Sequence, residues 1–184
     1  PVSVDDVVEV VEAAVEEGAA EFVYFNLGCS DSADAGIEFL EPYIDAVKGN
    51  FDTAVAVQLH PPKDNRWIDH TYAMGVDALS YNIEIHDADI LAARCPGRIR
   101  EVGRERYYEA LEYAARIFPN GTVWSELVLG VEPLASTQQG IEALTAIGVL
   151  PVLSLYRSPT APTETPHSTV AVEDIAPIYS HLFH

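Results

Sequence analysis

The stretch Ala78-Leu79-Ser80-Tyr81-Asn82-Ile83-Glu84-Ile85-His86-Asp87 alternates between apolar and polar residues with a period of two. This period is typical of a β-strand, in which successive side chains point to opposite faces. The polar face would carry Ser80, Asn82, Glu84 and His86. Apolar strand-like runs lie before and after the stretch, so we expect a central strand. Buried polar groups need partners, and this face is therefore expected to line a ligand cavity.

The rest of the chain alternates between helical and strand patterns. Strands are predicted at Phe22–Leu27, Thr53–His60, Leu79–His86, Val123–Gly130 and Val149–Tyr156. Helices are predicted at Val4–Glu17, Ala33–Val47, Asn65–Ala73, Asp87–Arg94, Arg104–Phe118, Thr137–Ile147 and Val172–Leu182. This order predicts a parallel sheet of right-handed strand–helix–strand units. A loop rich in proline and threonine, Ser158–Thr169, is expected after the last strand.

Several predicted strands carry polar residues on one alternating face, as Asn26 and Gln58 illustrate. Barrels place such inward residues at the C-terminal ends of their strands, where the site lies. The strands of a flat doubly wound sheet would be more continuously apolar. The fold prediction is an α/β protein, a partial TIM-type (β/α) barrel with five recognisable parallel strands. Residues 1–184 are expected to form a single domain.

The composition limits the classes of function. The chain has 184 residues, of which 48% are hydrophobic, enough for one substantial core. Its 29 acidic and 10 basic residues give a formal charge of −19, which disfavours nucleic acid and anionic membranes as partners. Neither a bilayer-spanning run nor a signal pattern is present, so we expect a soluble protein. The absence of a disulfide framework favours the cytoplasm. Scarce lysine and abundant acidic residues would also suit a saline habitat.

The cysteines and histidines do not form a recognisable metal motif. Cys29 and Cys95 are distant in sequence, which favours buried thiols in a reducing compartment. His60 and His86 end two predicted strands and could bind a metal together with Glu84. Histidines at strand ends are more often hydrogen-bonded lining residues, so we predict no metal site.

Three groups of residues suggest a ligand rich in hydrogen-bonding groups. Asn82 and Glu84 together suit the hydroxyls of a ribose. The predicted strand that contains Val128 ends in Gly130, which would allow a flat ring to approach the backbone, although an ordinary strand-to-helix turn is an alternative. The helix after the central strand opens with two arginines that could bind a carboxylate, although exposed surface positions are an alternative for either one. These arginines are Arg104 and Arg106.

These segments resemble the radical SAM superfamily, and most closely its biotin synthase and lipoyl synthase-like branch. The resemblance rests on Asn82-Ile83-Glu84, on the helix that begins Arg104-Glu105-Arg106, and on Val128-Leu129-Gly130-Val131-Glu132. It implies that Asn82 and Glu84 contact the ribose of S-adenosylmethionine and that Arg104 or Arg106 contacts the methionine carboxylate. Val128 and Gly130 would then face the adenine.

The resemblance also implies roles for two further strand ends. Asn26, Gly28 and Ser30 would lie where many members bind the methionine amino group. The substrate-side residues would be His60, His86, Tyr156 and Arg157.

The sequence departs from the family pattern at three points. The end of the first predicted strand reads Asn26-Leu27-Gly28-Cys29, without the G-G-E of many members, and Glu132 comes one residue early. The C-x-x-x-C-x-x-C run that ligates the four-iron four-sulfur cluster is also missing. Because the sequence begins at Pro1 without methionine, we expect the first barrel strand and the cluster loop to precede Pro1 in the parent protein.

Three functions remain open on the sequence alone. The first is a radical SAM core that binds S-adenosylmethionine and, with the parent's cluster, forms a 5′-deoxyadenosyl radical that abstracts hydrogen from a small-molecule substrate. The second is a barrel lyase or aldolase that uses Glu84 and His86 as acid–base groups. The third is a non-catalytic domain that binds a nucleoside.

Overall fold

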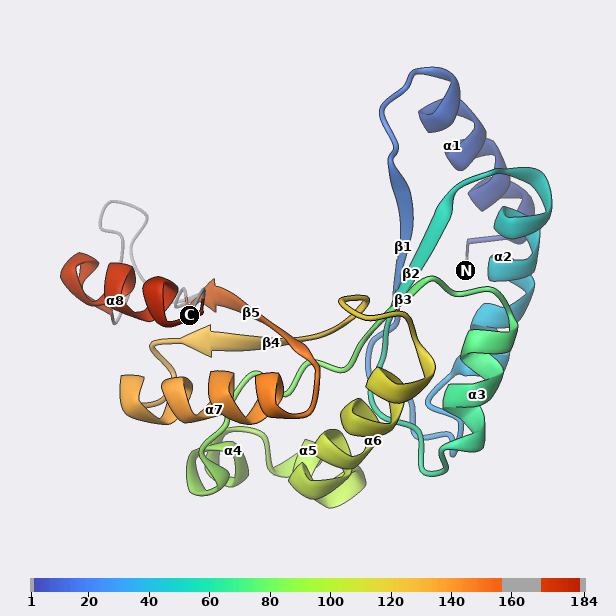
Figure 1. Ribbon diagram of the computed structural model, residues 1–184. Coiled ribbons are helices and arrows are strands. Elements are labelled where there is room, and N and C mark those ends of the chain that lie inside the picture. The colour runs from blue at the N-terminus through green and yellow to red at the C-terminus, as the bar shows by residue number, and fades with distance from the viewer. Residues whose placement is uncertain (1, 157–169, 183–184) are drawn as a thin grey trace.

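The computed structural model of the protein describes residues 2–156 and 170–182 (Figure 1). Within these ranges five strands form one sheet in the order β1-β2-β3-β4-β5, and every neighbouring pair is parallel. The strands are β1 Phe22–Asn26, β2 Ala54–Gln58, β3 Ala78–Ser80, β4 Val123–Leu129 and β5 Leu150–Leu155. The predicted α/β class with five parallel strands is confirmed. The sequential order fits a partial barrel, because a doubly wound sheet reverses its strand order at a switch point.

The helices lie on the outer side of this curved sheet. They are α1 Val4–Glu16, α2 Ile37–Asn50, α3 Arg66–Ala73, α4 Ala88–Arg94, α5 Pro96–Glu101, α6 Arg104–Ile117, α7 Leu134–Ala146 and α8 Val172–Leu182. In Figure 1, α1, α2 and α3 flank the strands β1 to β3, whereas α7 lies beneath β4. The described helices leave the concave face of the sheet open. Among the described residues, no helix is long and apolar enough to cross a membrane.

The core lies between the sheet and these helices. Val55 and Val57 of β2 and Leu127 and Leu129 of β4 point outward and are fully buried. The intervening residues of β4 are only partly buried and face the concave side, so burial along this strand alternates. The period-two pattern of β4 therefore separates a helix-covered face from an open one.

Two helix boundaries differ from the sequence prediction. The helix expected from Ala33 begins at Ile37, because Ala35 and Gly36 have positive φ angles (59° and 88°) that cannot continue a right-handed helix. The predicted break at Pro96 does end α4, but the same proline opens α5, which the prediction missed. Proline suits the first position of a helix, where its missing N–H has no intrahelical partner.

The central strand is the largest error of the prediction. β3 ends at Ser80, and the predicted strand Leu79–His86 is wrong beyond that residue. Within residues 81–87, only Glu84 returns to the sheet, through an isolated bridge to Leu127 of β4. The expectation of buried thiols also fails at Cys29, which is exposed, while Cys95 is partly buried. The predicted loop Ser158–Thr169 lies outside the described residues.

Candidate ligand site at the strand ends

A tight turn at Glu84 shapes the edge of the sheet where the strands end. Glu84 has a φ angle of 63°, and the Ile85 N–H donates to the Ile83 carbonyl over 2.8 Å, which closes a three-residue turn. The Glu84 N–H donates to the Glu126 carbonyl and its own carbonyl accepts from the Val128 N–H, both at 2.8 Å. A positive φ at a residue other than glycine is strained, and such residues concentrate at functional sites.

Side chains replace the missing strand pairing before this turn. The Ser125 hydroxyl donates to the Tyr81 carbonyl over 2.8 Å and accepts from the Ile83 N–H over 3.1 Å. Asn82 Oδ1 accepts from the Ser80 hydroxyl at 2.5 Å and from the Glu126 N–H at 3.1 Å. These bonds fix the backbone that leads into Glu84, and they occupy the acceptor capacity of Asn82.

Arg98 holds the turn from the other side. Its guanidinium donates to the carbonyls of Asn82 and Ile83, over 3.3 and 3.1 Å, and lies 3.1 Å from Glu84 Oε1. It stacks 5.6 Å from the centre of the Tyr107 ring and is largely buried. Sequence reasoning missed Arg98, because it predicted no helix at residues 96–101. The signal that could have found it is proline at the start of that short helix.

Two cavities meet at Glu84. A small one of about 70 Å³ lies over the ends of β1 and β2 and includes Asn26, Gly28, His60, Asn82 and Arg98 along its walls. A larger one of about 290 Å³ lies on the β4 side and includes Ile85, Val128, Gly130 and Tyr156. The structure therefore brings together most of the residues that the sequence singled out, in two groups on either side of one carboxylate.

A third cavity, of about 380 Å³, contains Ser30 and Arg106 and shares His60 with the small one. Arg106 donates to the Pro62 carbonyl (2.8 Å) and to Asn65 Oδ1 (2.7 Å), which fixes its guanidinium at the cavity wall. Arg157 lies outside the described residues.

His60 is oriented by Tyr107. Its Nδ1 lies 2.5 Å from the Tyr107 hydroxyl. Burial, with the charge of Arg98 as a smaller cause, lowers the pKa of His60, and burial raises the pKa of Tyr107. The neutral tyrosine hydroxyl can donate to Nδ1 or accept from an Nδ1–H, so this bond orients the imidazole ring in either tautomer of a neutral His60.

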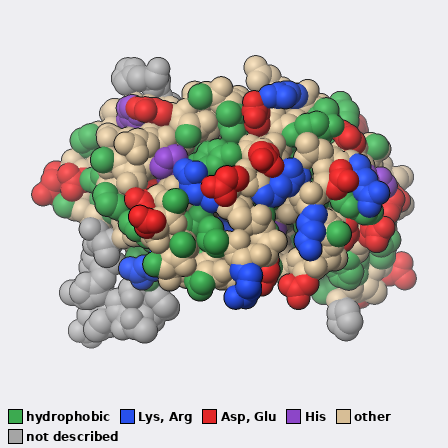
Figure 2. All heavy atoms as spheres, turned by 90° about the horizontal axis from the view of Figure 1, so that it is seen from below, with side chains coloured by type: hydrophobic (Ala, Val, Ile, Leu, Met, Phe, Trp, Pro, Cys, Tyr) green, Lys and Arg blue, Asp and Glu red, His purple; other side chains and the backbone are tan. Residues whose placement is uncertain are grey.

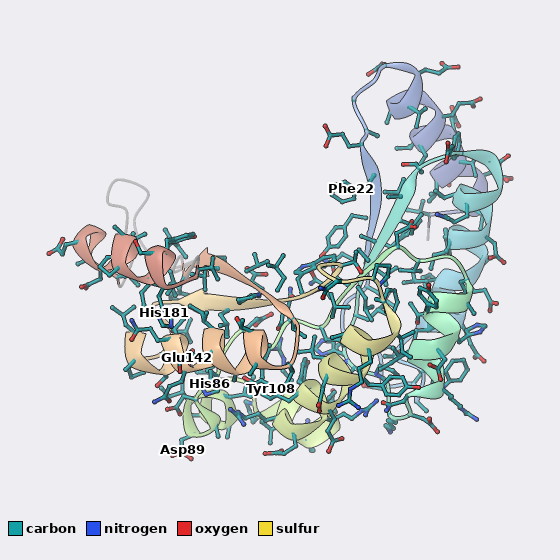
Figure 3. The ribbon with its side chains drawn as sticks, in the orientation of Figure 1. Phe22, His86, Asp89, Tyr108, Glu142 and His181 are labelled. Atoms are coloured by element: carbon teal, nitrogen blue, oxygen red, sulfur yellow. The ribbon has the colours of Figure 1, made fainter. Side chains whose placement is uncertain are left out.

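His86 and Arg104 lie away from these cavities. The His86 Nδ1 is 2.7 Å from the Tyr108 hydroxyl, and the Arg104 Nε donates to the His86 carbonyl over 2.9 Å. Figure 3 shows His86 and Tyr108 among α4, α6 and α7, on the opposite side of the sheet from Phe22. The prediction that His86 shares a face with Asn82 and Glu84 is wrong, because the turn at Glu84 reverses the alternation. Glu84 and His86 therefore do not form one acid–base site.

The face formed by α4, α5 and the start of α6 carries many of the few basic residues. Arg94, Arg98, Arg100, Arg104 and Arg106 fall within thirteen consecutive positions. Figure 2, which views the molecule from below, shows Lys and Arg side chains across the middle of this face with acidic groups among them. The local positive charge borders the cavities at the strand ends.

The residues present do not fit an iron–sulfur cluster. The whole sequence contains two cysteines, and a four-iron cluster held by a C-x-x-x-C-x-x-C motif needs three. The Cys29 thiol contacts Glu101, with Sγ 3.3 Å from the carboxylate oxygen. With Asp31 these two groups place potential metal ligands within 4.8 Å of one another, but all three residues are exposed. This exposed group lacks the geometry of a built metal site.

Comparison with known proteins points in the same direction as the motifs. A segment of 104 residues is 28% identical to bacteriochlorophyllide c C-7(1)-hydroxylase from Chlorobaculum limnaeum. It covers 56% of this chain and 26% of that protein, so the match spans about a quarter of the relative's length. No protein-family model matches the chain. The similarity supports a radical SAM relationship and an enzymatic function, without distinguishing a branch of the superfamily.

Proposed function

We propose that this chain forms the part of a radical SAM enzyme that holds S-adenosylmethionine. The observation that carries the proposal is the position of the Glu84 carboxylate at the junction of two cavities, where Arg98 and a strained turn fix it. A carboxylate held in this way can accept hydrogen bonds from two adjacent ribose hydroxyls.

We propose positions for the remaining parts of the ligand from the residues that line the cavities. The cavity on the β4 side has the size for an adenine, with Val128, Gly130 and Tyr156 along its walls. The methionine end would extend past Asn26 and Gly28 toward the cavity that contains Ser30 and Arg106. Of the two arginines considered for the carboxylate, the geometry favours Arg106, since Arg106 lines this cavity and Arg104 lies beside His86, away from it. A Cβ at Gly28 would meet no atom within 4 Å, so this position leaves room for a ligand.

Asn82 has a smaller role in this arrangement than the sequence suggested. Its Oδ1 already accepts two hydrogen bonds and its Nδ2 donates to Glu126 over 3.2 Å. We propose that Asn82 positions Glu84 and Glu126 and offers its second amide hydrogen to the ribose.

The chemistry of the proposed enzyme depends on groups outside this chain. Bound S-adenosylmethionine and a four-iron four-sulfur cluster would together supply a 5′-deoxyadenosyl radical for hydrogen abstraction. This chain's residues would bind the nucleoside, orient it and exclude water from it. The substrate is proposed to be a small molecule and the compartment the cytoplasm; the relative's hydroxylation of a bacteriochlorophyllide makes hydroxylation one candidate outcome.

Titration calorimetry of the purified protein with S-adenosylmethionine tests the proposal. We expect saturable binding, and Glu84→Gln should weaken it at least tenfold, because a neutral amide accepts less strongly from paired hydroxyls. Glu9→Gln removes an exposed carboxylate from α1, far in sequence from the proposed site, and is the matched control. Unchanged affinity in a folded Glu84→Gln protein would refute the ribose assignment.

S-adenosylhomocysteine and adenosine extend the same titration. A domain that binds only a nucleoside would bind adenosine as tightly as S-adenosylmethionine, and Arg106→Ala would not affect either. The radical SAM proposal requires Arg106→Ala to weaken the two methionine-derived ligands and to spare adenosine.

A further inference from the structure

The open face of the sheet carries an aromatic pair that the proposed nucleoside site does not use. Tyr24 of β1 and Trp124 of β4 point to the concave side, and their ring centres lie 6.1 Å apart at an interplanar angle of 33°. The inward residues between them on the central strands are small: Ala54, Ala56 and Ala78. The aromatic rings can meet across two strands because these alanines leave the space above them free.

This pair borders a cavity of about 560 Å³. Phe22 extends its apolar wall, and Figure 3 shows Phe22 pointing from β1 to the open side of the sheet. The charged residues along the cavity are acidic, Glu21 and Asp77, and no Lys, Arg or His of the described chain lines it. Asp77 is neutralised by Lys48 at 2.9 Å, on the side of α2.

Glu126 adds a third carboxylate to the same face. It is the next inward residue of β4 after Trp124, and its Oε2 accepts from Asn82 Nδ2 over 3.2 Å. In contrast to Glu84, Glu126 has no basic partner among the described residues. Glu126 is close enough to Tyr24 to affect its titration. Burial raises the pKa of the Tyr24 phenol most, and the negative charge of Glu126 raises it further.

We propose that this face binds the cationic amine end of the substrate, with the ammonium between the Glu126 carboxylate and the rings of Tyr24 and Trp124. Carboxylates and the faces of aromatic rings both attract cations, and the attraction increases where basic residues are absent. The acidic charge of the whole chain favours the approach of a cation to the open face. This inference rests on the proposed function, because it assigns an amine-containing substrate to the proposed radical SAM enzyme.

The backbone connects the two sites. The Glu126 carbonyl accepts from the Glu84 N–H at 2.8 Å. This backbone hydrogen bond joins a residue of the proposed ammonium site to the residue proposed to contact the ribose. An amine held at Glu126 would therefore place the adjoining carbon atoms of the substrate next to the nucleoside. This proximity is what hydrogen abstraction requires.

The test uses benzyltrimethylammonium and its neutral counterpart, neopentylbenzene, as probes of the purified protein. Trp124 is one of two tryptophans and lies on the proposed site, so intrinsic fluorescence in a Trp67→Phe background reports on binding. We expect saturable quenching by the cation, at least tenfold weaker binding of the neutral probe, and a loss of cation affinity of at least fivefold in Glu126→Gln. Glu9→Gln, which removes the same charge from α1, should retain the wild-type affinity.

The outcomes separate this inference from the proposed function. Equal binding of the two probes, unchanged affinity in Glu126→Gln, or no saturable quenching would each overturn the ammonium site, even where S-adenosylmethionine binds the wild-type protein. Failure of S-adenosylmethionine to bind, with cation binding intact, would overturn the proposed function and leave an ammonium-binding face.

Discussion

Strand β4 and the segment 81–87 relate sequence to structure in opposite ways: 81–87 alternates apolar and polar side chains, whereas β4 reads Val-Trp-Ser-Glu-Leu-Val-Leu without such alternation. Yet β4 is the region that forms seven residues of continuous strand, with alternating burial. In the segment 81–87 the strand has already ended at Ser80, and a turn with positive φ lies at its centre. Alternation therefore indicates that polar and apolar residues face different surroundings, but it does not require a strand.

The source of the backbone partners explains the difference. β4 pairs with β5 through six successive residues, from Trp124 to Leu129. Apart from the backbone bridge at Glu84, the segment 81–87 depends on side chains: Ser125 and Arg98 bind its carbonyls, and the buried Glu132 accepts from the Asp87 N–H over 2.7 Å. The first region is stabilised by a ladder, and the other by a few polar residues that come from elsewhere in the sequence.

Of the changes that test this difference, removal of Arg98 should destabilise the segment 81–87 most. Arg98→Leu would leave the Asn82 and Ile83 carbonyls and the Glu84 carboxylate without their donor. We expect a loss of about 2 kcal/mol in the free energy of unfolding, measured by urea denaturation. Hydrogen exchange should accelerate at residues 83–85 and remain slow in the middle of β4.

Arg100→Leu is the matched control for Arg98→Leu. Its guanidinium is on the same helix but is 74% exposed, and its ion pair with Glu101 at 3.5 Å is a surface contact. Such pairs contribute little, so the change should cost less than about 0.5 kcal/mol. Equal losses in the two variants would show that Arg98 does not hold the turn.

The second prediction compares glycine with alanine at position 84. Both substitutions remove the carboxylate, but only glycine adopts a φ of 63° without strain. Glu84→Gly should therefore be more stable than Glu84→Ala by about 1 kcal/mol in thermal or urea unfolding. At Val128 in β4 the order of stability should reverse. Val128→Gly should be less stable than Val128→Ala, because glycine loses more conformational freedom in a regular strand. The same order at both positions would contradict the strained turn.

Much of the fold could be predicted because it follows from local patterns. The capping box at the start of α1, in which Ser3 and Asp6 bind each other's backbone N–H, is visible in the sequence and formed in the structure. Polar inward residues such as Asn26 and Gln58 indicated a barrel, and the observed strand order agrees with it. The positive φ of Ala35 could not be predicted, since nothing in an alanine indicates a left-handed backbone.

The site was harder to predict because it depends on contacts between distant residues. The grouping of Asn26, Gly28 and Glu84 followed from strand ends that meet at one edge. Sequence reasoning did not identify Arg98 or Glu126, since Arg98 lies on an unpredicted helix and Glu126 resembles any polar residue of a regular strand. The separation of His86 from Glu84 depends on one turn that the alternation concealed.

The smallest expected effect concerns the pH dependence of the segment that ends at His86. Burial, with the charge of Arg104 as a second cause, lowers the pKa of His86 below its ordinary value of about 6.5. The unfolded chain then binds a proton more readily than the folded one as the pH falls through 6.5, so this contribution to stability is full above that pH and decreases below it.

From pH 7.5 to 5.5 the melting temperature should fall by a few degrees, and amide exchange should rise at Asp87 more than within β4. His86→Asn, which keeps a side-chain partner for Tyr108 but does not titrate, should reduce this pH dependence. If the variant retains the full wild-type slope, other groups cause it, and the neutral His86 does not stabilise the segment.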